Sequence, residues 1–177
     1  MLDHPNIEVS LETSYEDVRD QERWAHLVYT GPIDAFYGHR YGRLPYRSLR
    51  FEWERVPTPD GSLVQPVAQI SQPDEEVPHT RTVEYRHLYG RAARSSLLCR
   101  EYPSAEGDPL YPIPAPANRD LYHRYRALAD ADPGVTFVGR LARYQYLNMD
   151  QVTAQALATF ERLRPRLAGT AYRKTRA

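Results

Sequence analysis

The sequence is poor in cysteine and in long apolar runs. Cys99 is the single cysteine among 177 residues, which excludes an internal disulfide framework and fits a reducing compartment. No run approaches the ~20 apolar residues of a membrane-spanning helix. The first residues have neither the charged start nor the apolar stretch of a signal peptide. These absences predict a cytoplasmic protein with no membrane partner.

An excess of either charge is also lacking, and so are the usual phosphate-binding and metal-binding motifs. Lys plus Arg equals Asp plus Glu at 23 each, so no global field favours nucleic acid. There is no G-x-G-x-x-G and no G-x-x-x-x-G-K-[ST] loop. His79, His87 and Cys99 are too scattered for a zinc site, and we expect no metal. A nucleotide or flavin site would therefore have to be shared with another segment.

Tyrosine is abundant, with 14 Tyr against 4 Phe. A tyrosine offers an apolar ring and a hydroxyl donor, so the excess suits a wet pocket that holds polar oxygens. The half-buried faces of a sheet also favour tyrosine. Composition leaves both interpretations open.

Alternating apolar residues in the first two thirds predict a largely antiparallel sheet. The clearest strand has Leu49, Phe51 and Trp53 on one face and charged residues on the other. The expected strands cover residues 7–11, 27–29, 49–53, 67–70, 82–89 and 96–102. A sheet built mainly from hairpins follows.

The last third has helical spacing instead. Asn118 is expected to cap a helix with Leu121, Tyr125 and Leu128 on its apolar face. A short strand at 135–138 precedes a second helix, which begins after Asn148 with Gln151 as its capping-box partner. The expected apolar stripe of this second helix is Val152, Ala156, Phe160, Leu163 and Leu167. The predicted class is α+β, with the sheet first and the helices after it.

Several short motifs, weak individually, have an order and spacing typical of one family. They are 1–7 (MLDHPNI), 29–34 (YTGPID), 42–49 (GRLPYRSL), 80–87 (TR before EYRH), 100–103 (REYP), 111–114 (YPIP) and 139–150 (GRL leading to YQYLNMD). Together they span nearly the whole chain, which resembles the carboxy-terminal half of the UDP-galactopyranose mutase family.

The resemblance implies an isomerase that interconverts UDP-galactopyranose and UDP-galactofuranose. In that family reduced FAD attacks the anomeric carbon, UDP leaves, the sugar opens and recloses as a flavin–sugar adduct, and UDP returns. By this resemblance, residues 1–30 return to a flavin-binding α/β domain, 31–116 form the antiparallel substrate domain, 117–168 complete the flavin-binding domain, and 169–177 are a frayed tail. The expected partners are the UDP-galactose ring forms, an amino-terminal half carrying the glycine loop, and a second copy in a homodimer.

Three residues match family positions that hold the UDP diphosphate. Arg81 matches the arginine beside the leaving group, a catalytic role that suits an always-charged guanidinium. Tyr111 and Tyr146 match two tyrosines whose hydroxyls bind the same diphosphate. A strand arginine paired with Glu84 or another carboxylate, and tyrosines buried with satisfied hydroxyls, are the structural alternatives.

Four residues match cofactor-binding positions. Arg47 and Arg140 match arginines near the flavin, and Asn148 and Met149 begin the helix whose amino terminus would stabilise the anionic reduced flavin. A simple helix cap is compatible with that role.

The chain also departs from the family pattern. Asn148 replaces the usual Asp, Gln69 replaces Asn, and His39 stands where Tyr is common. Two other functions therefore stay open. One is a non-catalytic remnant or UDP-binding module, and the other is a different two-part flavin oxidoreductase.

Overall fold

The computed structural model describes residues 2–21, 24–90 and 92–168. Its elements, in order, are α1 (Tyr15–Val18), β1 (Leu27–Tyr29), α2 (Ile33–Phe36), β2 (Tyr46–Pro57), β3 (Gln69–Ser71), β4 (Arg81–Glu84), α3 (Arg86–Tyr89), β5 (Ser95–Ser104), β6 (Tyr111–Pro112), α4 (Pro116–Ala131), β7 (Val135–Phe137) and α5 (Met149–Leu167). No helix in the described part of the chain is long and apolar enough to cross a membrane. The mixture of helices and antiparallel strands agrees with the predicted α+β class.

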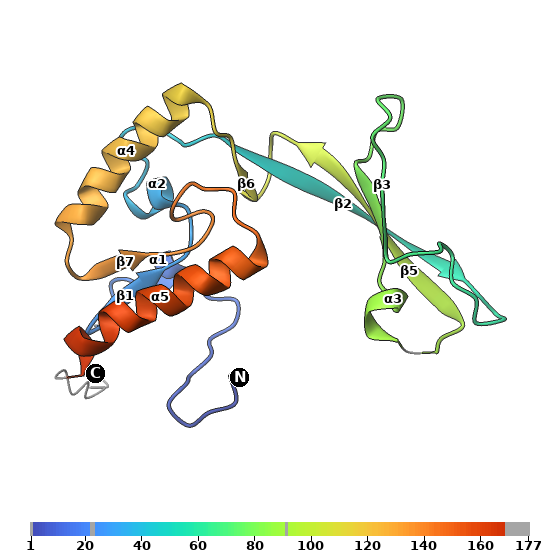
Figure 1. Ribbon diagram of the computed structural model, residues 1–177, viewed down its shortest axis with the longest axis horizontal. Helices are drawn as coiled ribbons and strands as arrows, with labels where there is room; N and C mark the ends of the chain where they lie inside the picture. The colour runs from blue at the N-terminus through green and yellow to red at the C-terminus, as the bar shows by residue number, and fades with distance from the viewer. Residues whose placement is uncertain (1, 22–23, 91, 169–177) are drawn as a thin grey trace.

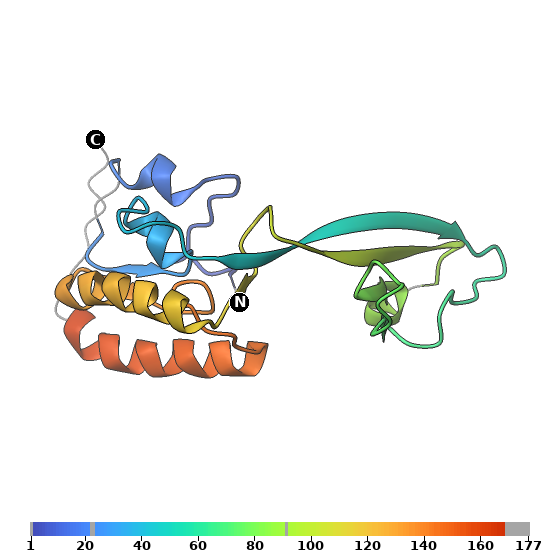
Figure 2. The same cartoon turned by 90° about the horizontal axis from the view of Figure 1, so that it is seen from above.

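A compact part holds both ends of the described chain (Figure 1). In it β1 pairs with β7 in parallel, with Leu27 opposite Val135 and Tyr29 opposite Phe137. Figure 2 shows α4 and α5 on one side of this part and α1 and α2 on the other. Segments from the two ends of the sequence therefore share one layer, because a parallel pair requires a long crossover connection.

The core of the compact part is aromatic. Ile33, Tyr125 and Ala142 are completely buried in it. The other buried members are Leu44, Ala129, Phe137 and Tyr144, and the residues packed against them are Tyr29, Phe36, Tyr37, Tyr41, Tyr46, Leu121, Tyr122, Leu128 and Val135. Much of the tyrosine excess therefore fills this core, and neither a wet pocket nor a sheet face alone accounts for it.

A five-stranded sheet in the order β3-β4-β5-β2-β6 extends away from the compact part (Figure 1). β2 and β5 pair antiparallel over ten residues, from Ser48 opposite Ser104 to Pro57 opposite Ser95. At the start of β2, Tyr46 and Arg47 pair with Pro112 and Tyr111 of β6. β2 thus runs from the compact part to the far end of the sheet.

Both faces of β2 are accessible along most of its length. Phe51 and Trp53 are about half exposed, at 47% and 55%. Such an exposed aromatic strand in a sheet is typical of a surface that packs against another segment.

Three sequence predictions about the strands are wrong. Residues 7–11 are irregular, and Ile7, Val9 and Leu11 are exposed, because a loose alternation forms no strand without a partner to pair with. The segment 82–89 is divided, since β4 ends at Glu84 and α3 begins at Arg86. The predicted sheet built mainly from hairpins is present only in β3, β4 and β5, because β2 pairs with β5 and β6 and not with the strand that follows it.

Tertiary contacts explain why the chain leaves the sheet after Glu84. The Arg86 guanidinium donates to Thr58 Oγ1 at 3.0 Å and to the carbonyls of Ser62 and Gly61 at 2.8 and 2.9 Å. These bonds hold the loop after β2 against α3. Gly90 then ends α3 with φ of 60°, a left-handed conformation that glycine adopts without strain.

The predicted helices are present, with two differences. α4 begins at Pro116, and Asn118 lies inside it, donating from Nδ2 to the Ile113 carbonyl at 2.8 Å rather than capping. α5 has the predicted Asn148–Gln151 capping box, and Leu163 of the predicted stripe is buried, but the other buried residue is Thr159, which the stripe did not include. Ala156 and Phe160 of the predicted stripe are exposed. The predicted tail 169–177 lies outside the described residues.

A buried carboxylate joins the sheet to the loop between β2 and β3. Glu84 is fully buried and accepts from the backbone N–H groups of Val64 and Gln65, at 3.1 and 2.8 Å, and from the Ser96 hydroxyl. His87 Nε2 lies 3.5 Å from the carboxylate. Burial alone would raise the pKa of Glu84, but these donors outweigh it and leave the pKa below its ordinary value.

Replacing Glu84 with glutamine is expected to lower the free energy of unfolding by about 1–3 kcal/mol at neutral pH, because an amide cannot accept at both positions. Because the pKa of Glu84 is lower in the folded than in the unfolded state, its carboxylate stabilises the folded protein at pH values above the unfolded-state pKa. That contribution disappears as pH falls through the folded-state value. Urea unfolding of E84Q and wild type should therefore converge in acid. Glu75→Gln, in an exposed loop, is the control and should match wild type throughout.

Candidate functional site

Arg140 joins two of the predicted substrate-binding tyrosines. Its guanidinium carbon lies 5.1 Å from the ring centre of Tyr111 and 5.0 Å from that of Tyr146. The two rings stack, with centres 5.8 Å apart and planes 19° apart. Arg140 also donates to the Leu147 carbonyl, from Nη2 at 2.6 Å and from Nε at 3.1 Å. One arginine thus organises β6 and the 139–148 turn.

The hydroxyl of Tyr144 holds the three segments that carry these residues. It donates to the Pro45 carbonyl at 2.6 Å, lies 3.1 Å from the Ile113 carbonyl, and accepts from the Ile113 N–H at 3.3 Å. Pro45 precedes β2, and Ile113 follows β6. Burial raises the pKa of Tyr144 above its ordinary value, so the hydroxyl keeps its proton.

The amino terminus of α5 is open beside this cluster. The Asn148 N–H donates to Gln151 Oε1 at 2.8 Å, as the capping box predicts. Met149, the first helical residue, is 87% exposed. The first N–H groups of a helix have no partners within it and carry partial positive charge, so this end can bind an anion. Asp150 in the first turn adds one exposed carboxylate nearby.

Arg47 lines a separate cavity of about 800 Å³, whose wall also includes Tyr29, Leu44 and Tyr46 of the compact core. Asp34 is 2% exposed in its wall and accepts at Oδ2 from the Leu44 N–H at 2.9 Å. His39 Nδ1 lies 3.1 Å from the same oxygen. The other oxygen, Oδ1, has no hydrogen-bond partner among the described residues. The cavity therefore offers one free buried acceptor together with the Arg47 guanidinium.

Arg81 lies on the extended sheet. Its Nε is 3.1 Å from Glu101 Oε2 on β5, and Nη1 donates to Gln69 Oε1 at 3.4 Å on β3. Arg81 lies directly opposite Glu101, and Glu101 lies directly opposite Phe51. Residues directly opposite one another share a face, so these three side chains lie on the same face of the sheet. The carboxylate partner is thus Glu101, while Glu84 is buried in its own cluster.

The structure brings Tyr111, Tyr146 and Arg140 together but keeps Arg81 apart from them. Phe51, two strands from Arg81, is four residues along β2 from Arg47, which is about 13 Å. A ligand that contacts both Arg81 and the tyrosine cluster would have to extend along the face of the sheet. A nucleoside diphosphate sugar is an extended molecule of this kind.

Sequence reasoning missed three residues that shape these sites. Glu101 orients Arg81, Asp34 presents the free oxygen, and Tyr144 fixes the segments. All three lie within the quoted motifs 29–34, 100–103 and 139–150, which are the signal that could have found them. Tyr144 has a left-handed φ of 49°, which no sequence pattern indicates. No group of three or more metal-ligating side chains occurs among the residues described.

Tyr144→Phe should lower the free energy of unfolding by about 1–3 kcal/mol, because it leaves the partly buried backbone groups of Pro45 and Ile113 without their hydroxyl partner. Urea unfolding measures this loss. The matched control is Tyr89→Phe, since Tyr89 is 72% exposed, and it should change stability little. Equal stabilities for the two variants would contradict the role given to the Tyr144 hydroxyl.

Comparison with known proteins gives a consistent result. The sequence profile of the UDP-galactopyranose mutase family matches residues 1–146. A probable UDP-galactopyranose mutase of Klebsiella pneumoniae is 37% identical over 163 residues, which cover 90% of this chain and 41% of the relative. A UDP-galactopyranose mutase of Mycoplasma pneumoniae is 35% identical over 181 residues, covering 92% and 44%.

A dTDP-fucopyranose mutase of Escherichia coli is also similar, at 32% identity over 166 residues, which cover 89% of this chain and 43% of the relative. The chain therefore spans about two fifths of the length of these relatives. On the extent of the profile match and on these identities, the chain belongs to the UDP-galactopyranose mutase family and corresponds to a carboxy-terminal portion of its sequence.

Proposed function

We propose that this chain supplies the diphosphate-binding and flavin-facing surfaces of a UDP-galactopyranose mutase. The observation that carries the proposal is the Arg140 cluster, which places Tyr111 and Tyr146 beside the open amino terminus of α5. Anion-binding groups for a diphosphate and for a reduced cofactor thus occur within one short stretch of structure.

The tyrosines and Arg81 have distinct roles in this proposal. The Tyr111 and Tyr146 hydroxyls donate to the diphosphate without adding charge, so they orient UDP and still allow it to leave and return. Arg81 stabilises the negative charge that grows on the phosphate oxygens as the anomeric bond breaks. Glu101 is a positioning residue, since its carboxylate fixes the direction of the Arg81 guanidinium.

FAD is the cofactor that the family implies, and the residues present fit it in one respect. The open end of α5, with Asn148 and Met149, suits a group that carries negative charge when reduced. Arg47 and the free Asp34 oxygen could contact its polar edge from the 800 Å³ cavity. When bound, the reduced flavin supplies the nucleophile that takes the sugar from UDP. The chain's own contribution is to hold the anions and to orient the leaving group.

The proposal requires an amino-terminal half as partner. The chain spans 41–44% of its relatives, and the described residues contain no glycine loop for the FAD pyrophosphate. Several apolar side chains are exposed where a partner could cover them: Val28 on β1, Leu157 and Phe160 on α5, and Phe51 and Trp53 on β2. Burying such a surface would favour assembly of the two halves. A homodimer would then form from the assembled enzyme.

The nucleotide sugar is proposed from the family alone. The similarity to a dTDP-fucopyranose mutase shows that related sequences act on another nucleoside diphosphate sugar. The diphosphate is common to both substrates, and it is the part for which this chain has candidate ligands. The choice of base and sugar is expected to depend on residues of the other half.

Co-expression of the chain with the amino-terminal portion of the Klebsiella relative tests the proposal. The expected result is a yellow complex that interconverts the two UDP-galactose ring forms after dithionite reduction. A colourless chain that binds UDP in a calorimeter would indicate a binding module instead. A colourless chain that binds no UDP would indicate a remnant, and a yellow complex that oxidises amines would indicate the oxidoreductase alternative.

Arg81→Ala in that complex should raise the barrier by roughly 2–4 kcal/mol, since it removes one preorganised donor to the leaving group. Steady-state kcat/KM for UDP-galactofuranose measures the loss. Arg55→Ala, an exposed arginine further along β2, is the control and should leave turnover unchanged. An Arg81→Ala enzyme with unchanged turnover would remove Arg81 from the diphosphate site.

Asn148→Asp should lower the reduction potential of bound flavin. The new carboxylate keeps the helix cap but adds a negative charge where the reduced cofactor's charge develops. A spectroscopic redox titration of the complex measures the potential. Gln72→Glu makes the same change of amide to carboxylate in the loop directly after β3 and should leave the potential unaltered. Identical potentials in all three proteins would place the cofactor away from α5.

A further inference from the structure

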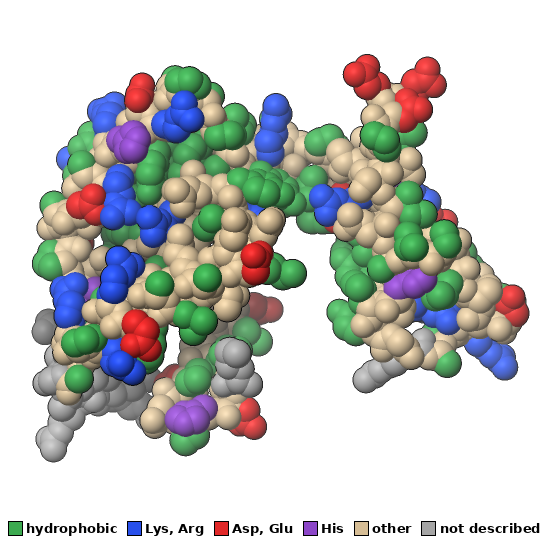
Figure 3. All heavy atoms as spheres, viewed as in Figure 1, with side chains coloured by type: hydrophobic (Ala, Val, Ile, Leu, Met, Phe, Trp, Pro, Cys, Tyr) green, Lys and Arg blue, Asp and Glu red, His purple; other side chains and the backbone are tan. Residues whose placement is uncertain are grey.

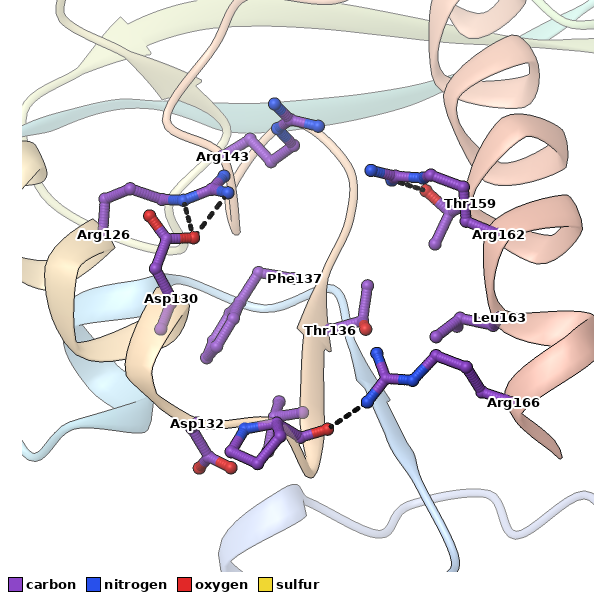
Figure 4. A pocket seen from close by; sticks show the side chains of 13 residues that line it. Arg126, Asp130, Asp132, Thr136, Phe137, Arg143, Thr159, Arg162, Leu163 and Arg166 are labelled. Atoms are coloured by element: carbon purple, nitrogen blue, oxygen red, sulfur yellow. Dashed lines mark hydrogen bonds and ion pairs between the residues drawn. The ribbon is translucent and has the colours of Figure 1, made fainter. Parts of the chain in front are cut away.

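A second cationic site lies on the compact part, in a cavity of about 430 Å³ between α4, β7 and α5. Its wall contains four arginines, namely Arg126, Arg143, Arg162 and Arg166, and two aspartates, Asp130 and Asp132. Figure 4 shows the guanidinium groups around the opening, while Phe137, Thr136 and Leu163 form the floor. Arginine side chains also gather over this region in the space-filling view (Figure 3).

The aspartates do not neutralise all of this positive charge. Asp130 is paired with Arg126, whose Nη2 and Nε lie 2.7 and 2.8 Å from Oδ1. Asp132 accepts at Oδ1 from the Gly134 N–H at 2.9 Å, which fixes the turn before β7. The nearest acidic residue on α5, Glu161, is paired with Arg164 at 2.9 Å, outside the cavity. Among the described residues, Arg143 and Arg162 form no ion pair with a carboxylate, although the charge of Arg143 also acts on Asp130.

The remaining guanidinium donors point to an acceptor that is not part of the described chain. Arg143 Nε is buried and has no hydrogen-bond partner among the described residues. Arg162 donates only one bond that the structure records, to Thr159 Oγ1 at 3.2 Å. Each guanidinium carries five N–H donors, and a buried donor left without an acceptor costs free energy. A bound oxyanion would supply several acceptors at once.

The surroundings agree with a positive local field. His26 Nε2 lies 2.8 Å from Thr136 Oγ1 on the cavity floor. Burial lowers the pKa of His26, and the positive charge of Arg166 lowers it further, with Asp132 opposing both. The Arg166 guanidinium also lies 3.4 Å from the Pro133 carbonyl at the cavity edge. The floor of Phe137 and Leu163 adds an apolar surface against which a small organic group could pack.

We propose that this cavity binds a small phosphate-bearing molecule, with the phosphate between Arg143 and Arg162 and the organic part over Phe137 and Leu163. Arginine is suited to the role because its planar fork donates two parallel bonds to phosphate oxygens. The volume exceeds what a bare phosphate ion needs, so a phosphomonoester or diphosphate fits better. The site is distinct from the Arg140 cluster and does not depend on the mutase function.

The test is calorimetric titration of the full chain with sodium pyrophosphate at fixed ionic strength, with circular dichroism to confirm folding. One saturable site is expected. Arg162→Gln and Arg143→Gln should each weaken it at least tenfold. Arg164→Gln, which makes the same charge change on the exposed face of α5, should stay within twofold of wild type.

Two results would overturn the proposal. One is the absence of saturable pyrophosphate binding in wild type. The other is equal weakening by Arg164→Gln, which would show a response to net charge alone. If Arg143→Gln fails to fold, pyrophosphate binding by Arg162→Gln still tests the proposal, because Arg162 is exposed. Parallel titrations with inorganic phosphate and with glycerol phosphate distinguish the free ion from a phosphomonoester, and tighter binding of the ester is expected.

Discussion

The hydroxyl of one buried tyrosine, Tyr144, fixes the geometry on which the candidate site depends. It bonds the residue before β2 and the residue after β6, while its own backbone belongs to the turn that carries Arg140 and Tyr146. Three segments far apart in the sequence are therefore held by one group. Tyr125 does the same for the 41–45 loop, since its hydroxyl donates to the Gly42 carbonyl at 2.7 Å and accepts from the Tyr41 N–H at 2.9 Å. These ring-and-hydroxyl contacts explain why tyrosine outnumbers phenylalanine in the core.

The extended sheet is held together mainly by polar contacts, unlike the aromatic core of the compact part. It buries little apolar surface of its own, and its fixed points are polar: the Glu84 cluster, the Arg86 bonds to the loop after β2, and the Arg81–Glu101 pair. Exposed aromatic residues on β2 remain available to a partner. A sheet of this kind is stiff along β2 and β5 because their ladder is long, so it can carry Arg81 at a defined distance from the compact part.

The two arginine-rich regions differ in how their charge is used. Around Arg140 the guanidinium faces two aromatic rings and backbone carbonyls, so its donors are largely occupied and the tyrosine hydroxyls and the α5 amino terminus remain for a ligand. Between α4 and α5 the reverse holds. There Arg126 is paired with Asp130, but Arg143 Nε has no hydrogen-bond partner among the described residues and Arg162 donates to Thr159 alone. In the second arrangement the donors of Arg143 and Arg162 therefore remain for a ligand.

The sequence by itself determined the α+β class, the strand around Leu49–Trp53, both carboxy-terminal helices and the capping box at Asn148, because local periodicity and capping chemistry act within a few residues. Its ordered motifs also indicated the family that the comparisons establish. Only the tertiary structure decided that 82–89 divides into a strand and a helix, that β2 pairs with β5, and that Arg81 binds Glu101. Only the tertiary structure, likewise, brought Arg140 together with Tyr111 and Tyr146 and gathered the arginines between α4 and α5. These contacts join residues far apart in the chain, and their free energy overrides local preference in ways that no short pattern records.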